Sequence, residues 1–191
     1  MFVISKVLTP LDYLRIKHPE KRFFDWVMPV ITGLIITCAI SFLPKSVSLI
    51  GKDSLVSLVN GILQILSGFY IASMAAVATF NKEGMDDVMQ GKPPILKQIK
   101  LTRRKFLTYL FGYLAFMSIG LYFVGGFLQL TSLNIKELHL STFPFIKSAL
   151  LFIYITTVCN IIYTTALGMY FMIDKMHDEK QKLIINSDRQ E

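Results

Sequence analysis

Four long runs of this chain contain no Asp, Glu, Lys or Arg, and they limit its fold more than any other feature. The runs are 27–43, 54–80, 106–130 and 148–173. The hydrocarbon layer of a membrane cannot hydrogen-bond a bare backbone, so a spanning segment must be a helix of about 20 apolar residues or a strand of a closed barrel. Barrel strands are shorter and alternate in polarity, and surface helices of a soluble bundle need a charged face. The sequence therefore predicts an all-α, polytopic membrane protein with four transmembrane helices.

The distribution of Lys and Arg predicts how this protein is oriented. The segments 1–26, 81–105 and 174–191 hold sixteen of the 20 basic residues, and the two remaining loops hold four. Cytoplasmic segments of membrane proteins carry an excess of Lys and Arg. We therefore expect a multi-pass protein of the cell inner membrane with both termini cytoplasmic. The expected parts are an N-terminal arm 1–26, a transmembrane domain 27–173 with a cytoplasmic loop 81–105, and a tail 174–191.

The N-terminal arm carries signals for a helix of its own. Thr9, Pro10 and Asp12 are typical of an N-cap, a first-turn proline and a capping acid. A short interfacial helix is expected here, with Tyr13 and Leu14 toward the lipid headgroups.

Basic residues near the expected membrane surface are candidates for binding anionic headgroups or a protein partner. Thr102 is a predicted N-cap, and the three cations after it oppose the dipole of the helix they begin. Attraction to anionic lipid, about 1 kcal/mol for each basic residue, explains them better. The loop 81–105 lacks the aromatic residues on which single-stranded nucleic acids stack, which disfavours direct nucleic-acid binding. The candidates are Arg15, Lys17, Lys21, Arg22, Arg103, Arg104 and Lys105.

Small and polar residues inside the expected spans mark helix contacts, because lipid tails supply no hydrophobic force between helices. The polar set either lines a pore or fixes helix packing, and both interpretations stay open. The polar residues are Asn60, Gln64, Ser67, Thr157, Asn160 and Thr164. The small residues expected at helix contacts are Gly33, Gly61, Gly68, Ala72, Ala76, Gly112, Gly120 and Gly168.

The residue types missing from the expected spans exclude several functions. Without an ionisable residue in a span, proton relays, voltage sensing and ion-coupled transport are disfavoured. The three histidines, His18, His139 and His177, are far apart in the chain. Cys38 and Cys159 fall inside spans, where cysteine behaves as a small apolar residue. We predict no catalytic residues, no metal site and no cofactor, and therefore no enzyme.

Two stretches of the chain resemble a group of small bacterial inner-membrane proteins. They are GFYIASMAAVATF from Gly68 to Phe80 and LTRRKFLTYLFGYLAF from Leu101 to Phe116. Some members of that group belong to retron-type antiphage modules, in which a membrane effector permeabilises the cell. A reverse transcriptase and its DNA product hold such effectors in check. The resemblance implies an effector of antiviral defence with a retron complex as its partner.

Two functional hypotheses follow from the sequence. The first is a small effector or channel-like protein that forms a homo-oligomer and permeabilises or depolarises the membrane, with Asn60, Gln64 and Asn160 along the leak path. The second is a non-catalytic scaffold or accessory subunit that binds a membrane or cytoplasmic partner through its arm and basic loop. A lipid-modifying enzyme would need ionisable groups clustered at one interface, and only Asp86 and Asp87 meet that condition.

Overall fold

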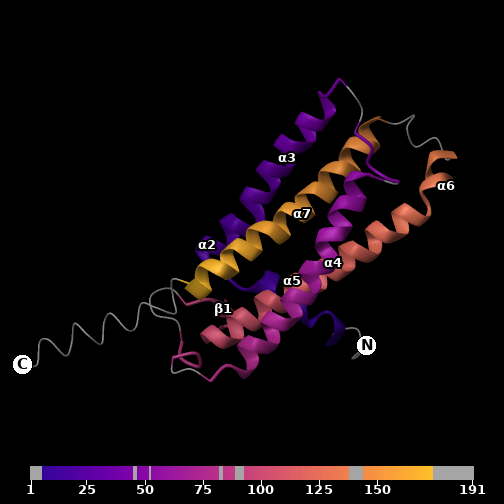
Figure 1. Ribbon diagram of the computed structural model, residues 1–191. Coiled ribbons are helices and arrows are strands. Elements are labelled where there is room, and N and C mark those ends of the chain that lie inside the picture. Colours follow the sequence, from indigo (N-terminus) through magenta and orange to yellow (C-terminus); the bar gives the residue numbers. More distant parts are fainter. Residues whose placement is uncertain are drawn as a thin grey trace, which may run out of the picture.

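The computed structural model describes residues 6–44, 47–51, 53–81, 84–88, 93–137 and 144–173. The predicted tail 174–191 lies outside these residues. The described chain is mainly helical, with a 3₁₀-helical turn η1 in the arm and a π-helical turn η2 ahead of the first long helix (Figure 1). In chain order the elements are η1 (Thr9–Arg15), α2 (Pro19–Arg22), η2 (Phe23–Val27), α3 (Met28–Ser41), α4 (Leu55–Thr79), β1 (Ile95–Leu96), β2 (Ile99–Lys100), α5 (Arg103–Leu130), α6 (Ser132–Glu137) and α7 (Pro144–Ile173).

Four helical segments are long and apolar enough to cross a membrane, which confirms the predicted all-α polytopic fold. They are Glu20–Ser41, Leu55–Thr79, Arg103–Leu130 and Phe145–Ile173. The last three match the uncharged runs to within a few residues. The first begins seven residues before the predicted start at 27, because α2, η2 and α3 form one continuous helix.

The π-helical turn lies where Pro29 disturbs that continuous helix. Proline has no N–H, and its ring clashes with the carbonyl four residues earlier, which here belongs to Asp25. A single wide turn inside a helix relieves this kind of conflict. Pro29 is buried, and the π-helical turn ends just ahead of it.

The helix starts are set by short polar caps. The Ser54 hydroxyl accepts a hydrogen bond from the Ser57 N–H at 3.2 Å, and the Thr102 hydroxyl accepts one from the Lys105 N–H at 3.3 Å. The predicted N-cap at Thr102 is therefore confirmed. In the arm, η1 is a 3₁₀ helix whose N-cap position is Leu8, without a side-chain cap bond, so Thr9 is not the predicted N-cap.

The four long helices pack as two pairs that meet through α5 and α7. Helix α3 lies beside α7 and α4 beside α5 (Figure 1). Helix α4 also reaches α7, because the Tyr70 and Thr165 hydroxyls form a hydrogen bond of 2.6 Å. Gly33 of α3 is in close contact with Thr156 of α7, and Gly168 of α7 with Leu110 of α5. Glycine permits these approaches because it has no Cβ.

The other small residues predicted at helix contacts lie in more open places. A Cβ added to Gly112 would lie 3.5 Å from the sulfur of Met74. One added to Gly61, Gly68 or Gly120 would meet no atom of the described chain within 4 Å. Ala72 and Ala76 of α4 are exposed.

The arm, the end of α4 and the start of α5 lie together at what we call the arm end of the bundle. The β1–β2 hairpin forms in the loop that precedes α5, and Ile95 pairs with Lys100 across it. Lys17 and Ile95 exchange backbone hydrogen bonds of 2.9 and 3.2 Å, which attach the arm to the hairpin. The core at this end contains Tyr13 and Ile16 of the arm.

Replacing Gly33 with Ala should lower the stability of the bundle. The new Cβ would lie 3.2 Å from the Thr156 backbone, so α3 and α7 would have to separate slightly. Overpacking of this kind costs about 1–3 kcal/mol. We expect a lower melting temperature in detergent micelles for Gly33→Ala, whereas Gly120→Ala should not lower it, since alanine favours helix and its Cβ enters open space. Equal melting temperatures for the two variants would contradict the proposed close packing.

Candidate functional site

A buried ion pair occupies the arm end of the first span. The Lys21 ammonium lies 2.8 Å from Oδ2 of Asp25, and the two residues are only 3% and 2% exposed. Two sequence predictions are therefore wrong. Lys21 is not a surface cation, and the first span does contain ionisable residues. Both errors arise because the helix starts earlier than the uncharged run and because the i, i+4 spacing lets the charges neutralise each other.

Hydrogen bonds from two other segments complete the environment of the Asp25 carboxylate. The Tyr13 hydroxyl of the arm donates to Oδ1 at 3.2 Å, and so does the Thr164 hydroxyl of α7, also at 3.2 Å. The Lys21 ammonium also lies 4.3 Å from the centre of the Tyr13 ring. A buried charge is tolerated only when it is paired and hydrogen-bonded, and Asp25 has both kinds of partner.

Asn160 of α7 binds the backbone at the same place. Its Nδ2 donates to the Asp25 carbonyl at 2.7 Å, and its Oδ1 accepts from the Tyr113 hydroxyl of α5 at 2.7 Å. The Asp25 carbonyl needs this donor because Pro29, four residues further on, has no N–H to offer it. Asn160 therefore takes the place of a missing helix hydrogen bond.

Tyr13 faces the interior of the bundle, not the lipid headgroups as the sequence predicted. Its side chain is fully buried, and its ring stacks on Tyr113 at a centroid distance of 4.8 Å. Burial raises the pKa of the Tyr13 hydroxyl well above its ordinary value, and the charge of Asp25 raises it further. Tyr13 therefore stays neutral and remains a hydrogen-bond donor at physiological pH.

A crevice of about 230 Å³ opens beside this network, between α3, α5 and α7. Thr156 also borders it, but its hydroxyl oxygen faces Gly33 of α3, where it is buried without a hydrogen-bond partner in the described chain. The crevice is mainly apolar, and its polar lining groups come from α7, from Asp25 and from Tyr113 of α5. Its lining residues are Leu14, Asp25, Trp26, Val30, Tyr113, Met117, Thr156, Thr157 and Asn160.

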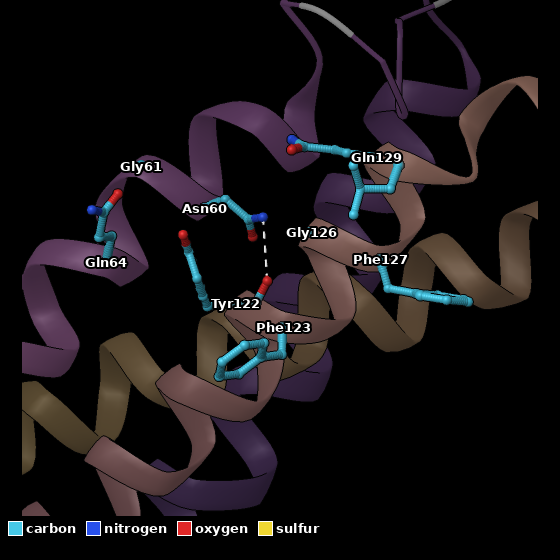
Figure 2. A pocket seen from close by; sticks show the side chains of 9 residues that line it. Asn60, Gly61, Gln64, Tyr122, Phe123, Gly126, Phe127 and Gln129 are labelled. Carbon is cyan, nitrogen blue, oxygen red and sulfur yellow. Dashed lines mark hydrogen bonds between the residues drawn. The ribbon is translucent and has the colours of Figure 1, made fainter.

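A second concave site lies between α4 and α5, toward the opposite end of the bundle. We call it the amide groove; its volume is about 470 Å³, and Asn60, Gln64 and Gln129 supply its amide groups (Figure 2). Asn60 is 7% exposed, and its Nδ2 donates to the Tyr122 carbonyl at 3.4 Å. Oδ1 of Asn60 and Nε2 of Gln129 are buried and have no hydrogen-bond partner among the described residues.

The predicted polar residues therefore do not form one stripe. Asn160 and Thr164 belong to the ion-pair network, whereas Asn60 and Gln64 belong to the amide groove. The hydroxyls of Ser67 and Thr157 donate to carbonyls of their own helices, at 3.0 and 2.8 Å. Within one chain the two sites are separate, so the described residues do not form a single polar path.

The Arg104 side chain binds other residues of this chain. It donates to both carboxylate oxygens of Asp86, at 2.8 and 3.0 Å, and to the carbonyls of Val77 and Ala78 at the end of α4. The hydrogen bonds from Arg104 lower the pKa of the Asp86 carboxyl. Asp86, the predicted candidate for surface chemistry, thus helps to hold α4 against α5.

The other predicted surface cations occupy different environments. Arg103 is largely buried, and Arg15 pairs with Asp12 at 2.9 Å. Lys17, Arg22 and Lys105 are exposed. Binding of headgroups or of a partner by these residues stays a prediction. Among the described residues, no group of three or more His, Cys, Asp or Glu side chains is placed to hold a metal ion.

Removing one charge of the Lys21–Asp25 ion pair should destabilise the bundle more than removing both charges. Lys21→Met leaves the Asp25 carboxylate buried without its cation, which typically costs about 3–5 kcal/mol. Adding Asp25→Asn removes the remaining charge and keeps an oxygen for Tyr13 and Thr164, so the double variant should regain most of that loss. The free energy of unfolding in detergent would measure both effects. A double variant that is no more stable than Lys21→Met would contradict the interpretation that Lys21 and Asp25 neutralise each other inside the bundle.

Four spans make this chain a multi-pass membrane protein. No protein-family model, no curated protein and no solved structure matches it. Because a fold alone does not determine function, its function is inferred from the geometry of its own residues.

Proposed function

We propose that this chain is an oligomer-forming effector that makes the inner membrane permeable, and that its N-terminal arm holds the leak path closed. The observation that carries the proposal is the crevice between α3, α5 and α7, which polar groups of Asp25, Tyr113 and Asn160 reach and which Leu14 of the arm helps to line. The permeant species are small ions, and the immediate result is depolarisation.

The crevice is mainly apolar, but polar side chains from three segments line part of it. Polar side chains at membrane depth occur mainly where they bind one another or line an aqueous cavity. Asn160 and Tyr113 bind each other there, and Thr157, which also lines the crevice, donates to a carbonyl of its own helix. Water that enters when the arm withdraws would hydrate these groups.

The arm is attached in a way that permits its release. The polar contacts that hold it include the Tyr13–Asp25 hydrogen bond, the backbone bonds between Lys17 and Ile95, and an exposed ion pair of Asp12 with Lys97 at 3.1 Å. Exposed ion pairs contribute little. The α3–α7 and α4–α5 contacts do not involve the arm, so it could withdraw while the four spans stay packed.

The sequence resemblance supplies a biological setting for this proposal. In a retron-type module, a complex of reverse transcriptase and DNA would restrain the effector, and the positive-inside prediction places the arm on the cytoplasmic side. We propose that such a complex stabilises the docked arm and that its loss during phage infection releases it.

Removing the Tyr13 side chain should increase the leak. Losing its hydrogen bond and packing should shift the docking equilibrium by about 1–3 kcal/mol, which corresponds to roughly 5- to 150-fold. Liposomes loaded with potassium should therefore lose it faster when they contain the full chain with Tyr13→Ala than when they contain the parent chain. Tyr13→Phe should have the same effect to a smaller degree. Tyr170→Ala is the matched control, because that tyrosine is 46% exposed on α7. If liposomes with the parent chain and liposomes with Tyr13→Ala both retain their potassium, permeabilisation is refuted.

Release of the arm should also admit water-soluble reagents to the crevice, whether or not ions leak. In a Cys38→Ala, Cys159→Ala background, Thr157→Cys places a thiol in the crevice and Ile162→Cys places one on the exposed, apolar side of α7. In lipid nanodiscs, a charged thiol reagent should modify Thr157→Cys faster once Tyr13→Ala is added. The thiol of Ile162→Cys should react slowly in both backgrounds. An unchanged rate at Thr157→Cys in a folded Tyr13→Ala variant would show that the arm does not close this crevice.

A further inference from the structure

Helix α4 presents a face of small residues and one exposed isoleucine, Ile65, that no other part of the described chain covers. Gly61, Gly68 and Ala72 are exposed, and a Cβ added to either glycine meets nothing within 4 Å. At 3.6 residues per turn, positions 61, 68 and 72 fall on one side of the helix. In membranes such faces let two helix backbones approach closely.

The amide groove beside this face lacks hydrogen-bond partners. Figure 2 shows Asn60 lying between α4 and α5, with Gln64 one turn further along α4. The orientation of the Asn60 amide is fixed by the Tyr122 carbonyl, which accepts from Nδ2. Oδ1 of Asn60 and Nε2 of Gln129 have no hydrogen-bond partner in the described chain, but both are buried within one copy, and Oδ1 of Asn60 lies against Gly125 of α5. The amide of Gln64 is exposed, so it is the one that a second surface can reach.

The chemistry of the groove indicates what covers it. None of its lining residues is charged, so the occupant is uncharged where it touches the amides. Lipid tails cannot hydrogen-bond amides. A second identical chain can, because an amide both donates and accepts. Two copies of equal orientation in one membrane are related by a two-fold axis along the membrane normal, which places residues of equal depth opposite each other.

We infer that this face of α4, together with the amide groove, binds a second copy of this chain. The small residues of the two α4 helices pack together, and Gln64 of each copy lies at the seam, where the two Gln64 amides can hydrogen-bond each other. This inference deepens the proposed function by naming the surface through which the effector self-associates. The crevice lies elsewhere, between α3, α5 and α7, so it remains available in the dimer.

Disulfide cross-linking in membranes tests the inference without reference to any leak. In the Cys38→Ala, Cys159→Ala background, Ala72→Cys lies within the proposed seam, whereas Ile62→Cys lies about 100° round the helix from Gly61. Oxidation should give a covalent dimer with Ala72→Cys and little or none with Ile62→Cys. Adding Gly68→Leu or Gln64→Leu to Ala72→Cys should reduce the dimer severalfold.

Both added substitutions should leave the protomer folded, which the melting temperature in detergent would check, because neither residue is buried within one chain. Equal cross-linking at positions 62 and 72, or a purified chain that stays monomeric with lipid bound in the groove, would overturn the inference. A dimer that forms in tight liposomes would support this surface while refuting permeabilisation. A leak that persists in a Gly68→Leu monomer would refute the dimer as the leaking form and leave the crevice proposal standing.

Discussion

The ion pair between Lys21 and Asp25 is the contact on which the arrangement of the bundle depends. Removing a charge from water is costly, and the cost is offset only when its partner and its hydrogen bonds are all in place. Here the cation comes from α2, and the hydrogen bonds to the Asp25 carboxylate come from Tyr13 of the arm and Thr164 of α7. Displacement of α7 would remove the Thr164 bond, whereas withdrawal of the arm would remove the Tyr13 bond and leave Lys21 and Thr164 as partners of the carboxylate. The geometry at this point therefore fixes how the arm, the first span and α7 lie relative to one another.

The sequence predicts the four spans because their uncharged runs are long, but it misplaces the start of the first one. A rule that ends a span at its first charge treats Asp25 and Lys21 as the polar flank of the arm. The two charges neutralise each other at i, i+4, so the helix continues through them. A search for opposite charges at this spacing beside an apolar run would have found the pair. Tyr13 gives no such signal, because an aromatic residue next to a span fits an interfacial position equally well.

The polar residues within the spans are evident from the sequence, but their partners are not. Asn60 and Asn160 are equally conspicuous asparagines in apolar helices. One lies in the amide groove and the other beside Asp25, because α4 packs on α5 whereas α7 packs on α3. Chain order does not reveal that pairing of helices. For the same reason the spacing of Gly68, Ala72 and Ala76 predicts a helix contact, but does not reveal that these residues face away from the chain's own bundle.

Pro29 and Asn160 act as one unit although they lie in different spans. The proline removes the helical donor to the Asp25 carbonyl, and a neighbouring helix can satisfy such a freed group inside a membrane. The Asn160 amide does so at 2.7 Å. Tyr113 orients that amide, because its hydroxyl donates to Oδ1 and leaves Nδ2 for the carbonyl. The π-helical turn that ends ahead of Pro29 contains Asp25, whose side chain faces both the arm and α7. Pro29, which weakens the first span, thus sets the position at which the Asp25 carboxylate binds the arm.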